Sequence, residues 1–148
     1  MNTPKVTVVT GSSSGIGRAI AQQLADAGYC VMLRRNENLA GLNETAESRA
    51  AAHGRSSLRI CTADVRDRRA CHQFVDAAFA WHGNVDAWIN NAGADVLTGP
   101  TSQLPFEERL QLLLAVDVSA TIRLSRCVAS RWLCASSLLN PPSIVNIG

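Results

Sequence analysis

The chain of 148 residues is poor in two residue types that often carry proton chemistry: it has one tyrosine, Tyr29, and one lysine, Lys5. It also has no apolar run close to the roughly 20 residues that a membrane-spanning helix needs. Its formal net charge is only +2, and its arginines are scattered along the chain. These absences argue against a membrane partner and against a nucleic-acid partner.

The five cysteines are odd in number and contain no CxxC pair. Such cysteines are more typical of a reducing compartment than of a disulfide framework. The first residues, MNTPKVTVVT, show no secretory signal pattern, so a cytoplasmic protein is expected. The three histidines, His53, His72 and His82, have no acid or cysteine at ligand spacing, and no metal site is predicted.

What the sequence does contain is a repeated order of short β-rich apolar runs and helical patterns. The predicted strands are Lys5–Thr10, Tyr29–Leu33, Leu58–Thr62, Val85–Asn90 and Ser143–Gly148. The predicted helices run from Gly15 to Gly28, from Asn36 to Gly54, from Asp67 to Gly83, and from Pro105 to the region of Cys134.

Strands that alternate with helices predict a parallel sheet with helices on both faces. We therefore expect an α/β, doubly wound Rossmann fold with strand order 3-2-1-4-5, built by one domain over residues 1–148. Ligands of such sheets bind beyond the carboxyl ends of strands one and four, where the strand order reverses. The last strand would have an open edge at Ile144-Val145, which invites pairing with another chain.

The segment Thr10–Gly17 reads TGSSSGIG and lies between the first strand and the first helix. A diphosphate must come close to the first turn of a helix to meet its free N–H groups and its positive dipole end. Side chains at Gly11, Gly15 and Gly17 would obstruct the turn, the ligand and the packing of the helix on the strand, respectively. The predicted diphosphate-binding residues are Gly11, Ser13, Ser14, Gly15, Ile16 and Gly17. The alternative interpretation is a flexible turn without a ligand.

The spacing of this loop is GxxxGxG, and three later segments follow it in a familiar order: Asp64-Val65, Asn90-Asn91-Ala92-Gly93 and Val116-Asp117-Val118. Together they resemble the short-chain dehydrogenase/reductase family over essentially the whole chain. The resemblance implies a contact between Asp64 and the adenine ring. It also implies cofactor-binding roles for Val65, Asn91, Ala92 and Gly93.

The end of the second strand bears on the choice of cofactor. A carboxylate at this place accepts hydrogen bonds from the ribose of NAD and repels a 2′-phosphate. Here Arg34 and Arg35 occupy the position, and no acid follows until Glu37. Two guanidinium groups suit a 2′-phosphate, so NADP is predicted, with NAD as the second choice. The alternative is that the arginines point into water beside Glu37.

Most catalytic residues that the resemblance implies have no counterpart in this sequence. The family uses a tyrosine with a lysine four residues later, but Leu33 stands four residues after Tyr29. It also uses a serine beyond the fifth strand, whereas Ser143 begins that strand. The family's domain continues with another helix and further strands, so the resemblance implies that this domain is truncated after strand five. Asp117 stands where the family usually has an asparagine. Its carboxylate can accept a hydrogen bond but cannot donate one, so Asp117 either serves a proton relay in altered form or caps a kink in the helix.

The resemblance thus implies an NAD(P)(H)-dependent oxidoreductase that acts on a small-molecule carbonyl or alcohol, although this chain alone is expected to be inactive. The alternative is a non-catalytic dinucleotide-binding module or pseudoenzyme. A Rossmann methyltransferase is disfavoured, because the NNAG segment and the paired arginines have no role there. The resemblance also implies a homo-oligomer that pairs through the long helix carrying Leu110 to Trp132. The basic cluster Arg66, Arg68 and Arg69, together with Asp64 and Asp67, is interpreted as a solvated helix start.

Overall fold

The computed structural model describes residues 4–35, 57–135 and 141–147, and in them the predicted parallel sheet is confirmed. Its order is β3-β2-β1-β4-β5, and all neighbouring strands run parallel. The strands are β1 (Val6–Thr10), β2 (Cys30–Arg35), β3 (Leu58–Thr62), β4 (Ala87–Asn90) and β5 (Ser143–Asn146).

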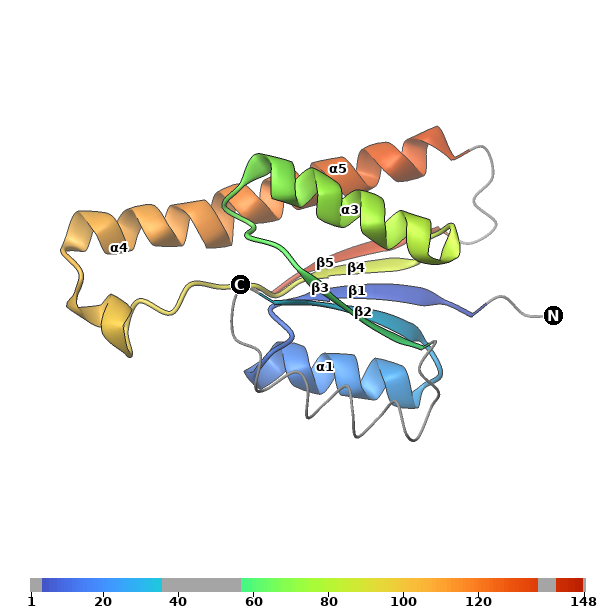
Figure 1. Cartoon of the computed structure of the whole chain (residues 1–148), viewed down its shortest axis with the longest axis horizontal. Coiled ribbons are helices and arrows are strands. Elements are labelled where there is room, and N and C mark those ends of the chain that lie inside the picture. Colours follow the sequence, from blue (N-terminus) through green and yellow to red (C-terminus); the bar gives the residue numbers. More distant parts are fainter. Residues whose placement is uncertain (1–3, 36–56, 136–140, 148) are drawn as a thin grey trace.

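Helices cover both faces of the sheet. Figure 1 shows α1 on one face and α3 and α5 on the other, while α4 extends beyond the carboxyl ends of the strands. The helical elements are α1 (Gly15–Asp26), α3 (Arg68–His82), the 3₁₀ turn η1 (Pro100–Gln103), α4 (Phe106–Leu113), the π-helical segment η2 (Leu114–Ala120) and α5 (Thr121–Cys134).

The ends of α3 follow directly from local sequence. The side chain of Asp67 accepts a hydrogen bond from the backbone N–H of Ala70, which satisfies one of the free donors of the first turn. Gly83 ends the helix in the left-handed region, with φ 78°. Between these two caps, Cys71, Phe74, Val75 and Ala78 form the buried face.

Alternation along the strands divides the core into two parts. Val8, Met32 and Trp88 point toward α3 and α5, whereas Val9 and Leu33 point toward α1. The ring of Phe74 meets Trp88 edge to face at a centroid distance of 5.2 Å. The sheet is therefore held from both sides, which fixes the positions of the loops at its carboxyl edge.

Several boundaries differ from the predicted ones. β2 continues through Arg34 and Arg35 instead of ending at Leu33, because both residues pair with β3. Apolar periodicity cannot detect such a continuation into charged residues. The strands β1, β4 and β5 are each shorter than predicted. The predicted helix from Asn36 to Gly54 lies outside the described residues.

The predicted long helix is three consecutive helical segments. The chain turns into α-helix at Phe106, directly after Pro105, and passes through η2 before α5 begins. Leu124, Val128 and Trp132 are buried against the sheet. A second row of apolar side chains remains exposed along the same helices, at Leu110, Leu114, Val118 and Ile122. No helix within the described ranges combines the length and the apolar character that crossing a membrane requires.

Replacing Phe74 by alanine should lower the free energy of unfolding by about 3–5 kcal/mol, because it removes a fully buried ring and leaves a cavity beside Trp88. Urea unfolding measures this change. The matched control is Leu133→Ala on α5, where the side chain is 86% exposed and the expected change is within about 0.5 kcal/mol. Equal effects of the two substitutions would contradict the described core.

Candidate cofactor-binding site

The carboxyl ends of β1 and β4 are joined by the hydroxyl of Thr10. Its oxygen accepts hydrogen bonds from the backbone N–H groups of Asn91, at 2.9 Å, and Ala92, at 3.0 Å. The same hydroxyl donates to the carbonyl of Ile89 at 3.4 Å. Thr10 is 1% exposed, so these bonds lie away from water. They hold the glycine loop against the loop that follows β4, at the position where ligands bind in doubly wound sheets.

Asn91 adds a second connection between the two loops. Its side-chain amide donates to the carbonyl oxygens of Thr10, at 3.3 Å, and Gly11, at 3.1 Å. Ser12 links the glycine loop to β2, since its hydroxyl donates to the carbonyl of Arg34 at 3.3 Å. The glycine loop is thus fixed on both sides.

Close packing of these loops explains two of the three glycines. A Cβ atom at Gly11, where φ is 64°, would lie 2.7 Å from the Cα of Ala92. A Cβ atom at Gly17 would lie 2.2 Å from the amide nitrogen of Asn91 and 2.4 Å from the carbonyl oxygen of Gly11. The predicted reason for Gly17, packing of the helix on a strand, is therefore wrong: the close neighbours are the two loops.

The third glycine faces open space. Gly15 has φ 54°, and nothing lies within 4 Å of the place that its Cβ would take. Ser14 caps α1 without a side-chain hydrogen bond, and the first turn of α1 contains no acidic residue. Ile16 beside it is 64% exposed. The amino end of α1 therefore offers backbone N–H groups and room for an anion, so these residues fit the diphosphate of a dinucleotide.

A cleft of about 340 Å³ opens next to this helix start. It brings together seven of the predicted cofactor-binding residues: Gly11, Ser13, Arg34, Asp64, Val65, Ala92 and Gly93. The lining does not include Ser14, Gly15, Ile16, Gly17 or Asn91. Arg35 ends β2, and its side chain lies outside the described part of the structure.

Arg34 is a buried cation in the wall of the cleft. Its residue exposure is 4%, and its Nε donates to the carbonyl oxygen of Ala63 at 2.8 Å. One terminal nitrogen of the guanidinium donates to the same oxygen. Burial lowers the pKa of Arg34, whereas the nearby negative charge of Asp64 raises it. The guanidinium is therefore held in one orientation and does not simply point into water.

Asp64 forms an ion pair with Arg66, which also lines the cleft. The carboxylate accepts hydrogen bonds from the guanidinium of Arg66 at 2.7–3.0 Å. It also accepts one from the backbone N–H of Arg66 at 2.9 Å. Hydrogen bonding from the Arg66 side chain is the main cause that lowers the pKa of Asp64. The Arg66 side chain is 50% exposed, so it stays solvated while it pairs with Asp64, as the interpretation of a solvated cluster with this acid expects.

Asp117 approaches the cleft from η2. Its carboxylate oxygen accepts a hydrogen bond from the backbone N–H of Ala94 at 3.0 Å. A Cβ atom at Gly93 would lie 3.2 Å from the same oxygen. Asp117 thus holds the loop after β4 against the π-helical segment, and its role in a proton relay stays a prediction.

The only tyrosine and the only lysine of the sequence lie near each other, but at the amino ends of the strands, opposite the cleft. The Nζ atom of Lys5 is 6.0 Å from the centroid of the Tyr29 ring. Both residues immediately precede strands, β1 and β2, and so they lie at the amino ends, whereas the cleft is at the carboxyl ends. Within the described ranges, no three His, Cys, Asp or Glu side chains form a group that could hold a metal ion.

The sheet order and the glycine-lined cleft define a Rossmann-type α/β domain. A sequence profile described as short chain dehydrogenase matches residues 5–148, so the chain belongs to this family.

The chain is also similar to individual proteins of known sequence or structure. A 1-deoxy-11-beta-hydroxypentalenate dehydrogenase from Streptomyces avermitilis is 34% identical over 133 residues, which is 88% of this chain and 47% of the relative. The crystal structure of a metagenomic short-chain oxidoreductase in complex with NADP is 30% identical with a TM-score of 0.80, and the match covers 97% of this chain and 62% of that one. A Brucella melitensis 3-oxoacyl-[acyl-carrier protein] reductase in complex with NAD shares the fold at 24% identity, with a TM-score of 0.81 and coverage of 99% and 56%. The chain thus spans about half the length of these relatives.

Replacing Thr10 by valine should lower the free energy of unfolding by about 1–3 kcal/mol, because it leaves the N–H groups of Asn91 and Ala92 without their acceptor. Thermal or urea unfolding measures the change. Thr7 on the same strand provides the control: its hydroxyl is equally buried and has no hydrogen-bond partner within the described residues. Thr7→Val should leave the stability unchanged or raise it. The account of this site fails if both variants lose the same stability.

Proposed function

We propose that this chain is the cofactor-binding part of an NADP(H)-dependent oxidoreductase that acts on a small-molecule carbonyl or alcohol. When bound, the nicotinamide ring would supply or accept the hydride. The observation that carries the proposal is the fixed glycine loop in front of α1, where Gly15 leaves open space beside N–H groups that no side chain caps.

Different residues of the chain would bind different parts of the dinucleotide. Backbone N–H groups at the start of α1 would bind the diphosphate, together with the hydroxyls of Ser13 and Ser14. Asp64 would meet the adenine, and its carboxylate is held in place by Arg66. Asn91 would keep the glycine loop in its present shape, because its amide already binds two carbonyl oxygens there.

A preference for NADP over NAD rests on Arg34 and Arg35 at the end of β2. Arg34 lines the cleft, and its bond to Ala63 restricts its guanidinium, which reduces the entropy lost on binding a 2′-phosphate. β2 itself ends without an acidic residue, and the nearby Asp64 is paired with Arg66. NAD is the second candidate.

Turnover by these 148 residues alone is not expected. Proton transfer to the substrate needs an acid or base beside the nicotinamide. Tyr29 and Lys5 lie instead at the amino ends of the strands. Asp117 is bound to the backbone of Ala94 and would act chiefly by positioning that loop. The position of Tyr29 and Lys5 away from the cleft also favours a second candidate function, a non-catalytic dinucleotide-binding module. A Tyr-x-x-x-Lys pattern in further sequence of this protein would decide for the enzyme.

The proposal also covers the oligomeric state of the protein and its compartment. The exposed side chains of Leu110, Leu114 and Val118 would be covered by a second copy of the chain in a homo-oligomer. All five cysteines are free, which suits a reducing compartment such as the cytoplasm.

A fluorescence titration of the purified protein with NADPH and NADH tests the function and the cofactor choice together. NADPH should bind about tenfold or more tightly than NADH, because each charge-assisted bond to the phosphate contributes about 1.5–3 kcal/mol. Arg34→Ala and Arg35→Ala should each reduce this ratio.

The matched control is Arg59→Ala on β3, an exposed arginine outside the cleft lining. It should keep the ratio. Since removal of the buried Arg34 could disturb folding, Arg34→Lys serves as a second variant that keeps the charge and loses the forked geometry. Equal affinities for the two dinucleotides in all variants would contradict the phosphate clamp, and absence of binding by either would contradict the function itself.

A further inference from the structure

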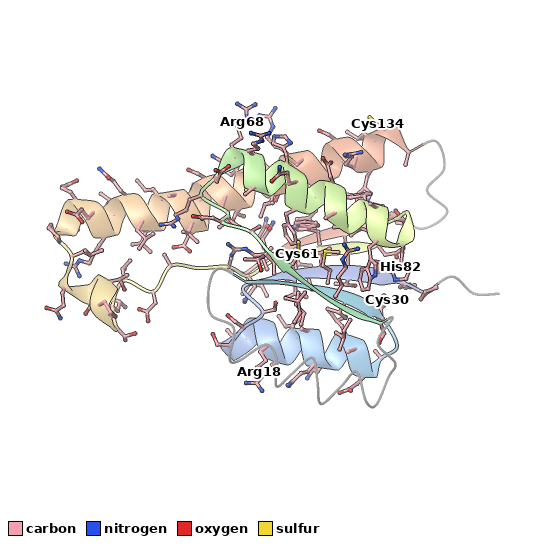
Figure 2. All side chains as sticks on the ribbon, in the orientation of Figure 1. Arg18, Cys30, Cys61, Arg68, His82 and Cys134 are labelled. Carbon is pink, nitrogen blue, oxygen red and sulfur yellow. The ribbon has the colours of Figure 1, made fainter. Side chains whose placement is uncertain are left out.

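A second cavity lies on the outer side of α3 and α5, away from the cofactor cleft. It is a groove of about 1080 Å³, and it shares no lining residue with the cleft. Its lining includes the thiol of Cys127, the imidazole of His72 and the guanidinium groups of Arg68 and Arg126. Figure 2 shows Arg68 and Cys134 on this outer side, with Arg18 on the opposite face of the molecule.

Cys127 and His72 are in direct contact across the two helices. The Sγ atom of Cys127 lies 3.6 Å from Nδ1 and 3.8 Å from Nε2 of His72. The thiol is therefore in contact with a side chain that can donate or accept a proton, depending on its tautomer. Reactive cysteines occur in such partly exposed, electropositive surroundings, whereas fully buried cysteines are inert.

The other cysteines lack this combination. Cys71 is fully buried and its thiol donates to the carbonyl of Val65, while burial raises its pKa. Burial also raises the pKa of Cys30 and of Cys61. Cys134 is exposed at the far end of the same groove and has no histidine contact within the described residues. Cys127 is thus distinguished by its neighbour and not by exposure alone.

The charges of the groove indicate what kind of molecule would reach this thiol. Arg131 is paired with Asp76. Arg68 and Arg126 are both exposed, and neither has an acidic partner among residues 4–35, 57–135 and 141–147. Two uncompensated guanidinium groups attract carboxylates, which they can bind with two parallel hydrogen bonds.

We propose that Cys127 is a site of thiol modification by anionic low-molecular-weight disulfides such as glutathione disulfide. His72 takes the proton of the thiol, and the sulfur attacks one sulfur of the disulfide. The disulfide bond of the reagent breaks, a mixed disulfide forms at Cys127, and the other half leaves as a thiolate that takes up a proton. Arg68 and Arg126 bind the carboxylates of the reagent during the attack. This site goes beyond the dinucleotide function and does not depend on it.

Parallel reactions with a charged and an uncharged reagent test the proposal. The purified protein is treated with glutathione disulfide or with the neutral 2-hydroxyethyl disulfide, and peptide mass mapping follows the adducts at Cys127 and Cys134 over time. Relative to Cys134, Cys127 should favour the anionic reagent by about threefold for each arginine, a value within the range of exposed ion pairs.

Variants separate the roles of the neighbours. Arg68→Gln and Arg126→Gln should each slow the reaction of Cys127 with glutathione disulfide, by about threefold, and leave the neutral reagent unaffected. His72→Gln should slow both reagents at Cys127 by at least about tenfold, at the low end of what a positioned base contributes. The matched controls are His82→Gln at the other end of α3 and Arg18→Gln on α1, which should change neither rate (Figure 2).

The variants concern exposed side chains, except for the half-buried Arg18, and circular dichroism checks that they fold. If Cys127 and Cys134 have the same anionic-to-neutral ratio, the arginines do not guide the reagent and the proposal is overturned. It is equally overturned if Cys127 reacts more slowly than Cys134 with glutathione disulfide, or if His72→Gln leaves its rate unchanged.

Discussion

The hydrogen bonds that the Thr10 hydroxyl accepts from Asn91 and Ala92 determine the shape of the candidate site. β1 and β4 are neighbours in the sheet, but the chain leaves them toward opposite faces, into α1 and toward α4. Without a connection, the two loops would be free to separate. With it, the glycine loop lies so close to Ala92 that only glycine fits at position 11. The open space at Gly15 lies four residues further along the same loop.

Buried and paired charges make up the second side of the cleft. The guanidinium of Arg34 gives up contact with water and receives a carbonyl oxygen in return, so burial costs it less than it would an unpaired ion. Asp64 is neutralised by Arg66 at the surface of the same cleft. The wall is therefore preorganised before any ligand arrives. The proposed preference for a ligand with an additional phosphate rests on Arg34 in this wall.

Much of this arrangement could be predicted from the sequence. The alternation of β-rich runs and helical patterns predicts the sheet order correctly, and TGSSSGIG marks the start of α1. The reason for Gly17 could not be predicted, because its close neighbours are 74 and six residues away in the chain, at Asn91 and Gly11. The burial of Arg34 could not be predicted either, since charged residues at the end of a strand are normally exposed to solvent. The contact between Cys127 and His72 joins residues 55 positions apart, and no local pattern reports it.

The central claim is that the backbone at the start of α1 binds the diphosphate of a nicotinamide dinucleotide. A crystal structure of the protein with NADP⁺ tests it most directly. The account predicts diphosphate oxygens within hydrogen-bond distance of the N–H groups of residues 15–17, with Gly15 facing the ligand. A complex in which the diphosphate lies elsewhere, with this helix start turned toward solvent, would contradict the account.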